Sequence, residues 1–226
     1  LYQRRFARHG RKVAQVLLTR SGLENRERYL NARRTLQTLL ELGVVPIVNE
    51  NDTVSTEEIR FGDNDNLSAT IVNLIGADLL VILTDVEGLL EHRPSAEHPK
   101  PALIPTVHSI TREIEAIAEG AGSAFGSGGM ATKLQAARTA ALSGAATVLC
   151  RGNARDVLLR VAAGEPVGTI LLPPDGEKRL ASRKHWLAFT TRTRGQTDVD
   201  AGAAQALIER GRSLLTAGNV GAPGRF

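Results

Sequence analysis

Short apolar runs alternate with segments of helical periodicity along most of this 226-residue chain, and this alternation constrains the fold more than any other feature. Four runs rich in branched apolar side chains predict buried strands at residues 13–18, 44–48, 79–83 and 146–150. Apolar residues at helical spacing predict helices at residues 26–42, 64–75, 110–119, 131–142 and 155–163. Such alternation predicts an α/β domain with a mostly parallel sheet. The wholly apolar run 79–83 predicts a central strand that is covered on both faces.

The composition is typical of a soluble globular protein, with 42% hydrophobic and 23% charged residues. There is no run of about 18 apolar residues, so no membrane span is predicted. Residues 1–6 lack the apolar core of a signal peptide. The single cysteine, Cys150, ends an apolar run, and we interpret it as a buried small hydrophobe in a reducing compartment. We therefore expect a cytoplasmic protein.

Basic residues are concentrated at the start of the chain and in its last third, and the formal net charge is +4. RNA or an acidic partner could bind such a patch. Proteins that hold single strands usually place aromatic side chains among the basic ones, and here only Trp186 and Phe189 do so. Solvated surface is therefore the preferred interpretation of this charge.

The last part of the chain differs from the rest. Residues 173–176 contain two prolines and a glycine, which mark a boundary. Short strands are predicted around Trp186 and Val199, followed by a helix at residues 203–210. The remaining stretch is short for a domain that holds its own core. We predict two domains, at residues 1–182 and 183–226.

A glycine run leads directly into the predicted helix 131–142, in the order Gly126-Ser127-Gly128-Gly129-Met130-Ala131-Thr132-Lys133. Small residues let backbone N–H groups approach an anion at a helix N-terminus. Lys133 would stand in the first turn, where the helix dipole disfavours a cation unless an anion is near. The pattern predicts a phosphate site, and the alternative is a surface loop with a solvated lysine.

Three polar loops follow or precede predicted elements. Residues 62–66 place two carboxylates and two amides at a helix start, and an N-cap explains one of the four. Residues 49–52 follow a strand, and their amides and carboxylates could bind an amino acid. Thr84 and Asp85 follow another strand and suit a ribose or a metal-bound phosphate. A turn or cap is the alternative interpretation of each loop taken alone.

Together these segments resemble the glutamate 5-kinases of the amino acid kinase family. The matching stretches are residues 26–33, 45–52, 62–69, 83–89 and 126–137. What distinguishes the glutamate 5-kinases is the combination of Asn-Glu-Asn-Asp with Gly-Asp-Asn-Asp-Asn. Other amino acid kinases share the fold and the helix that carries the lysine, but not this pair of motifs. The resemblance implies an incomplete amino acid kinase fold, a three-layer α/β sandwich, followed by the start of a β-rich, PUA-like domain.

The resemblance also implies roles for single residues. It implies that Asp52, Asn64 and Asn49 bind glutamate, that Asp65 organises the reacting groups, and that Lys133 is catalytic. It implies ATP contacts for Thr84, Asp85, Ser127, Gly128, Gly129, Met130, Ala131, Thr132 and Lys133.

The implied reaction is the ATP-dependent phosphorylation of the side-chain carboxylate of L-glutamate to L-glutamyl 5-phosphate, the first step of proline biosynthesis, with Mg²⁺. Proline as feedback inhibitor and a homo-oligomer, dimer or tetramer, are implied as well. The family's N-terminal strand and loops have no match here, so we expect weak or no activity and an unpaired sheet edge. The alternatives from other classes are an RNA-binding module through the PUA-like tail, and a non-catalytic sensor of an amino acid or nucleotide.

Overall fold

The chain is described by a computed structural model over residues 1–51, 64–92, 99–120, 129–174, 184, 186–187, 198–208 and 219–221. It divides into two compact units, Leu1–Thr190 and Thr191–Phe226. The domain boundary that the sequence suggests at residue 182 stays a prediction.

The described part of the first unit contains two separate sheets. β1 (Lys12–Leu18) and β2 (Val44–Glu50) pair in parallel along their whole length. The second sheet has the order β3 (Leu79–Thr84), β5 (Ala146–Arg151), β6 (Thr169–Leu171) and β4 (Thr106–Val107). β3 is parallel to β5 and β4 to β6, whereas β5 and β6 are antiparallel. The prediction of a mostly parallel arrangement, with strands at all four apolar runs, is therefore confirmed.

The predicted helices of the first unit are also present, with ends shifted by a few residues. They are α3 (Arg26–Glu41), α4 (Asn64–Ile75), α5 (Arg112–Gly120), α6 (Met130–Ala141) and α7 (Val157–Ala162). Two short helices, α1 (Tyr2–Ala7) and α2 (Arg20–Glu24), were not predicted. Gly43 and Gly76 directly follow the last turns of α3 and α4 with φ of +69° and +70°, a conformation that glycine adopts without steric cost.

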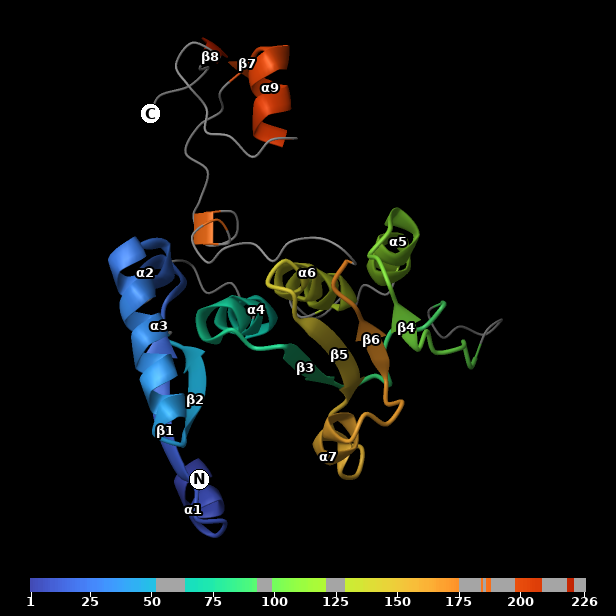
Figure 1. Ribbon diagram of the computed structural model, residues 1–226. Coiled ribbons are helices and arrows are strands. Elements are labelled where there is room, and N and C mark those ends of the chain that lie inside the picture. Colours follow the sequence, from blue (N-terminus) through green and yellow to red (C-terminus); the bar gives the residue numbers. More distant parts are fainter. Residues whose placement is uncertain are drawn as a thin grey trace. The chain divides into compact units, whose positions relative to one another are not determined.

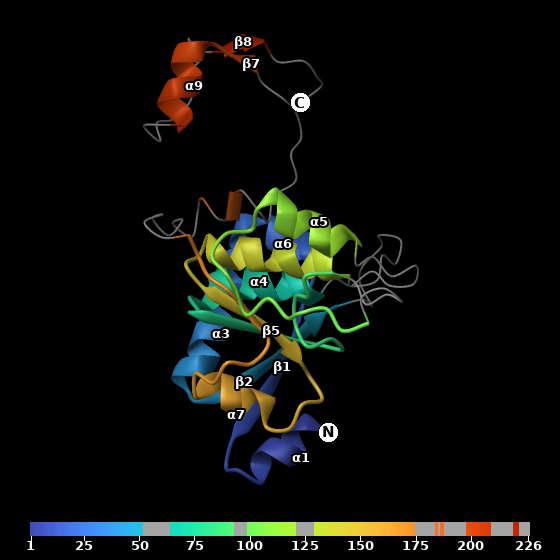
Figure 2. The ribbon, with the colours of Figure 1, turned by 90° about the vertical axis from the view of Figure 1, so that its right-hand side faces the viewer.

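The helices and strands form layers. Figure 1 shows α4 and α6 side by side on one face of the four-stranded sheet and α7 on its other face. α3 lies against the β1–β2 pair in the same view. In the turned view of Figure 2, α5, α6 and α4 follow one another above β5. This is the α/β sandwich that the resemblance implied.

α4 joins the two sheets because it is apolar on two faces. Its Ala69 and Val72 belong to the core over the four-stranded sheet, together with Leu80, Ile82, Leu134 and Leu149. Its Leu74 is buried in a second core that contains Leu23, Tyr29 and Leu36. A helix that is apolar on more than one side is buried between neighbours. Packing on two sides therefore fixes the position of the first turn of α4, where the candidate site begins.

The prediction that residues 79–83 form a central strand is wrong for the described part of the sheet. β3 is the end strand of the four-stranded sheet, and Leu79 and Leu83 are 42% and 46% exposed. β5, which has a neighbour on each side, buries Val148, Leu149 and Cys150 almost completely. The apolar run shows that the segment favours burial, but it does not specify the neighbours that would provide it. Burial also raises the pKa of the Cys150 thiol.

The second unit contains one short antiparallel strand pair and one helix among its described residues. β7 (Asp198–Val199) pairs antiparallel with β8 (Asn219–Gly221). α9 (Ala201–Ile208) begins after Asp200, whose carboxylate accepts a hydrogen bond from the Ala203 N–H at 2.7 Å. Trp186, which precedes this unit, is helical, so the strand prediction is wrong at this residue, and residues 188 and 189 lie outside the described part of the chain. No helix in the described part of the chain is long and apolar enough to cross a bilayer.

Candidate active site

Asp65 and Lys133 meet between α4 and α6. The Nζ atom of Lys133 lies 3.0 Å from Oδ2 of Asp65, within hydrogen-bond distance. Their side chains are only 12% and 19% exposed. The pair joins residues 68 positions apart in the sequence. Partial burial strengthens the attraction and makes it costly to leave either charge without its partner.

Small residues let the two helices approach closely. Ala69 on α4 is completely buried, and so are Ala136 and Ala140 on α6. Side chains of this size allow short interaxial distances because nothing larger separates the two backbones. The helix starts thereby come near enough for the short carboxylate of Asp65 to reach an ammonium on the neighbouring helix.

The first turn of α6 has an unusual charge arrangement. Its N-cap is Gly129, which makes no side-chain capping bond, and the Thr132 hydroxyl donates to the Gly129 carbonyl at 2.7 Å. Lys133 stands near the positive end of this helix, where a cation is disfavoured. Asp65 stands near the positive end of α4, where an anion is favoured, and it offsets Lys133. The pair is neutral as a whole, so two helix N-termini remain that attract an anion.

A second group of polar residues lies where β3 and β5 end. Thr84 is the last residue of β3, and its hydroxyl donates to the Asp85 carboxylate at 3.0 Å. Arg151 is opposite Thr84 in the β3–β5 register, and the next N–H, that of Gly152, donates to the Thr84 carbonyl. Arg151 Nη1 also lies 2.8 Å from Glu87 Oε1. In open parallel sheets this end of the strands is where ligands bind.

Arg151 is absent from the residues that the sequence suggested for the site. A signal was available, because a cation directly after a buried apolar strand stands at the carboxyl end of that strand. Its side chain is 44% exposed.

The other predicted residues fall into three groups. Asn64 begins α4, beside Asp65, and its carbonyl accepts a hydrogen bond from the Ser68 hydroxyl at 2.6 Å. Asn49 was predicted in a loop, but it lies within β2, because pairing with β1 continues as far as Leu18 opposite Glu50. Asp52, Ser127 and Gly128 lie outside the described residues.

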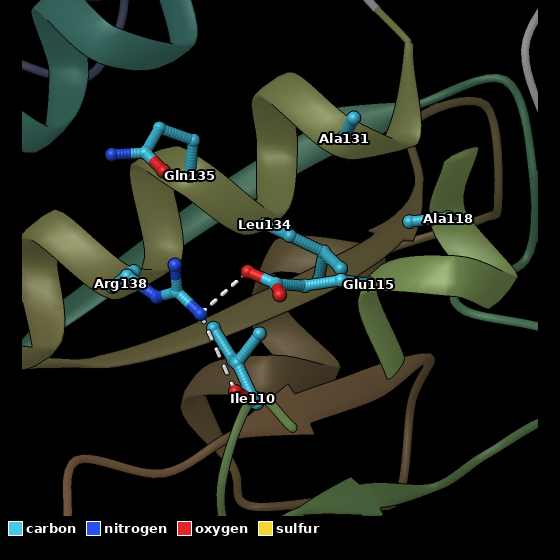
Figure 3. Close-up of a pocket in the computed structure, with 7 residues that line it drawn as sticks. All are labelled: Ile110, Glu115, Ala118, Ala131, Leu134, Gln135 and Arg138. Carbon is cyan, nitrogen blue, oxygen red and sulfur yellow. Dashed lines mark hydrogen bonds and ion pairs between the residues drawn. The ribbon is translucent and has the colours of Figure 1, made fainter. Parts of the chain in front are cut away.

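A cavity of about 180 Å³ opens between α5 and α6 (Figure 3), and Lys133 is not among its lining residues. Its lining residues on α6 recur every three or four positions and so share one face of the helix. Arg138 and Glu115 form an ion pair of 2.6 Å at this cavity, and Arg138 also donates to the Ile110 carbonyl. Of the predicted nucleotide contacts that the structure describes, Ala131 is the one that lines it.

No group of three or more histidine, cysteine or acidic side chains that could hold a metal ion occurs among the residues the structure describes. Asp85, at the carboxyl end of β3, is a carboxylate that could contribute one oxygen ligand to a metal bound mainly by phosphate and water.

The sequence profile of the amino acid kinase family matches residues 1–152. The chain belongs to the amino acid kinase family. This family member resembles the solved UMP kinase from Bacillus anthracis with a TM-score of 0.50 over 78% of this chain and 64% of that chain. Their sequences are 14% identical, so this likeness concerns the fold alone.

Curated glutamate 5-kinases are similar to this family member along its whole length. That of Trichlorobacter lovleyi is 52% identical over 226 residues, which are 100% of this chain and 59% of the relative. That of Pelobacter propionicus is 51% identical over 225 residues, which are 100% of this chain and 60% of the relative. The chain thus spans about 60% of the length of these relatives.

Proposed function

We propose that this family member transfers the γ-phosphoryl group of ATP to the side-chain carboxylate of L-glutamate, giving L-glutamyl 5-phosphate and ADP. This would be the first step of proline biosynthesis. The observation that carries the proposal is the Lys133–Asp65 pair at the adjoining starts of α4 and α6. The name of relatives at 51–52% identity, glutamate 5-kinase, supplies the substrate.

The chemistry of this reaction asks for charge neutralisation rather than for a base. A glutamate side chain has a pKa of about 4.3, so at neutral pH the nucleophile is already ionised. A carboxylate oxygen forms a bond to the γ-phosphorus, and the bond from that phosphorus to the β,γ-bridging oxygen breaks as ADP leaves. The obstacle is that an anion must approach a polyanion, and catalysis then consists of positioning and electrostatic stabilisation.

Lys133 supplies the positive charge in this proposal. Its ammonium lies near the start of α6, where the positive end of the helix would also attract an anion. Asp65 holds the ammonium in place at 3.0 Å and does not take up a proton from the substrate. A fixed ammonium is a stronger stabiliser of transferring phosphoryl charge than a mobile one, because no reorganisation is needed during the reaction.

The remaining assignments follow the resemblance and stay predictions. We assign glutamate binding to Asp52, Asn64 and Asn49. We assign ATP binding to Thr84, Asp85, Ser127, Gly128, Gly129, Met130, Ala131, Thr132 and Lys133. Mg²⁺ would arrive on the ATP phosphates, since phosphate oxygens and water supply most of its ligands in kinases. When bound, it would neutralise part of the phosphate charge, and Asp85 fits as its protein ligand.

Four further parts of the proposal rest on the same resemblance. They are feedback inhibition by proline, assembly into a homodimer or homotetramer, a cytoplasmic location, and a PUA-like domain within residues 183–226. Sedimentation of the chain at several concentrations, with and without proline, tests the assembly and a proline-linked change in it. A single sedimenting species of monomer mass under all conditions would contradict the assembly.

Trapping of the product with hydroxylamine tests the reaction itself. Acyl phosphates react with hydroxylamine to form hydroxamates, which iron(III) turns into coloured complexes. We expect the 226-residue chain, incubated for hours with MgATP and L-glutamate, to form hydroxamate slowly but above the background without ATP. L-Glutamine is the matched control substrate, because its side chain has the same length and no ionised carboxylate.

Two measurements decide the proposal. Hydroxamate that forms with L-glutamate and not with L-glutamine supports it. If no hydroxamate forms and titration calorimetry detects no MgATP binding, the proposal is rejected for this chain.

A further inference from the structure

Trp186, the one tryptophan of the chain, docks at the junction of α2 and α3. Its indole N–H donates to the carbonyl of Leu23 at 2.9 Å. Leu23 is in the last turn of α2, where carbonyl groups have no donor within the helix. The indole ring also packs against Tyr29 of α3, with ring centroids 6.3 Å apart and planes tilted by 56°. One side chain therefore contacts both helices.

Arg26 binds to the faces of both aromatic rings. Its guanidinium carbon lies 5.3 Å from the ring centroid of Tyr29 and 5.2 Å from that of Trp186. Its Nη1 atom is buried and has no hydrogen-bond partner among the described residues. Contact with the two rings is therefore a large part of what stabilises this guanidinium, and removal of the Trp186 ring would take away one of its two faces.

A chain of hydrogen bonds leads from this cluster to α4 and to the end of α6. The Tyr29 side chain is completely buried, and its hydroxyl donates to Oδ1 of Asn73 on α4 at 2.5 Å. Nδ2 of Asn73 in turn donates to the Ser143 hydroxyl, just after α6 ends, at 3.2 Å. Buried polar groups of this kind fix a single arrangement, because leaving one of them unsatisfied costs free energy.

The same two helices carry the candidate active site at their other ends. Asp65 is in the first turn of α4 and Asn73 in its last part, while Lys133 and Ser143 mark the start and the end of α6. The Tyr29–Asn73–Ser143 chain and the Asp65–Lys133 pair thus connect α4 to α6 at two separate places.

We propose that Trp186 is a positioning residue: by holding Arg26 and Tyr29 it fixes α4, and with it Asp65, relative to Lys133. The effect of Trp186 on activity rests on the proposed kinase function, whereas its effect on the position of α4 does not. The contacts described above link the Trp186 cluster to α4 through Tyr29 and Asn73, so its effect on Asp65 passes through the placement of α4.

Hydrogen exchange of α4 tests the proposal on the full chain. Trp186→Ala removes the ring, Tyr29→Phe removes the bond to Asn73, and Trp186→Phe keeps a ring over Arg26 and Tyr29 but has no indole N–H. We expect amides of residues 64–75 to exchange about tenfold faster in the first two variants, the effect of one lost buried contact, and less than half as much in the third. Amides of β5 serve as the internal reference.

Tyr2→Phe is the matched control, since Tyr2 is the other tyrosine of the chain and is 56% exposed. It should leave the exchange of α4 unchanged. Exchange of α4 within twofold of the unmodified protein in both Trp186→Ala and Tyr29→Phe would overturn the proposal. An equal acceleration in α4 and β5 would overturn it too, because it would show a general loss of stability.

Hydroxamate formation separates this inference from the proposed function. If the unmodified chain forms hydroxamate, Trp186→Ala should lower kcat several-fold with little change in the KM for ATP, and Trp186→Phe should restore most of the loss. If the unmodified chain forms none and binds no MgATP, the kinase proposal fails, and the exchange rates of α4 still decide whether Trp186 positions this helix.

Discussion

Two ion pairs of this molecule have similar lengths and different surroundings. Lys133 and Asp65 are 3.0 Å apart with 12% and 19% of their side chains exposed, whereas Arg151 and Glu87 are 2.8 Å apart with 44% and 63% exposed. Water screens the second pair and leaves it little net stabilisation. The first pair is held between packed helices, where attraction is stronger and separation costlier. The comparison teaches that helix packing, more than the distance between the charges, determines how much an ion pair stabilises the fold.

The largest expected difference between the two pairs concerns turnover. Lys133→Ala should lower the rate of hydroxamate formation about 100-fold or more, because it removes the cation that we assign to the transferring phosphoryl group. Arg151→Ala should lower the rate much less, by about threefold, because Arg151 lies beside the predicted ATP contact Thr84 but is not the cation that we assign to the transferring phosphoryl group. Initial rates at saturating MgATP and L-glutamate provide the measurement, and equal losses in the two variants would contradict the distinction.

Overpacking of the α4–α6 interface tests how tightly the two helices pack around the Asp65–Lys133 pair. Ala140→Leu inserts a larger side chain at a completely buried position of α6 and should destabilise the fold by about 3 kcal/mol. Urea unfolding measures the change. The control is Ala162→Leu at the exposed end of α7, which should stay within about 0.5 kcal/mol of the unmodified protein. If the free energy of unfolding falls as little in Ala140→Leu as in Ala162→Leu, the α4–α6 contact is not tightly packed.

Removal of one charge from each pair gives a smaller contrast. Asp65→Asn leaves the Lys133 ammonium partly buried without its carboxylate and should cost about 2 kcal/mol in free energy of unfolding. Glu87→Gln makes the same chemical change at the exposed pair and should cost less than about 0.5 kcal/mol. Both values come from urea unfolding curves at neutral pH. The distinction is wrong if Glu87→Gln proves as costly as Asp65→Asn.

The smallest effect is the response to salt. Double-mutant cycles give the coupling energy within each pair, which we expect to be about 0.5 kcal/mol for Arg151 and Glu87 at low ionic strength. Raising NaCl to about 1 M should bring that coupling close to zero, while the coupling between Asp65 and Lys133 should keep most of its value. A coupling that falls equally in both pairs would show that water reaches the two sites alike.

Local patterns predicted the elements well, because each element carries its own signals. The helices α4 and α6 have helical spacing of apolar residues, and Gly76 directly follows the end of α4. The meeting of Asp65 and Lys133 is different, since periodicity says nothing about which helices become neighbours. That expectation came from the resemblance to glutamate 5-kinases, and the 3.0 Å contact agrees with it while leaving the catalytic roles as predictions.

The errors share one physical cause, which is that a segment does not encode its surroundings. The run 79–83 is apolar enough for a central strand, yet β3 has one partner among the described strands. Trp186 looked like part of a strand, but its indole bonds to a carbonyl 163 positions earlier in the chain. The sequence shows that Arg151 follows an apolar strand, but its position opposite Thr84 depends on the β3–β5 register, which no local pattern specifies.

The two sheets that α4 joins close connections of different lengths, and this difference predicts the order in which contacts form during folding. β1 and β2 pair residues such as Lys12 and Val44 across a short connection that contains α2 and α3, whereas β3 and β5 pair Leu79 with Ala146 across a far longer one. Short loops close at lower entropic cost, so we expect β1, α3 and β2 to assemble early. Asp65 and Lys133 would then come together in a late step, when α4 docks against α6. Pulse-labelled refolding should show protection in β1 and β2 before β5, and a molecule caught between these events would have folded strands but no working site.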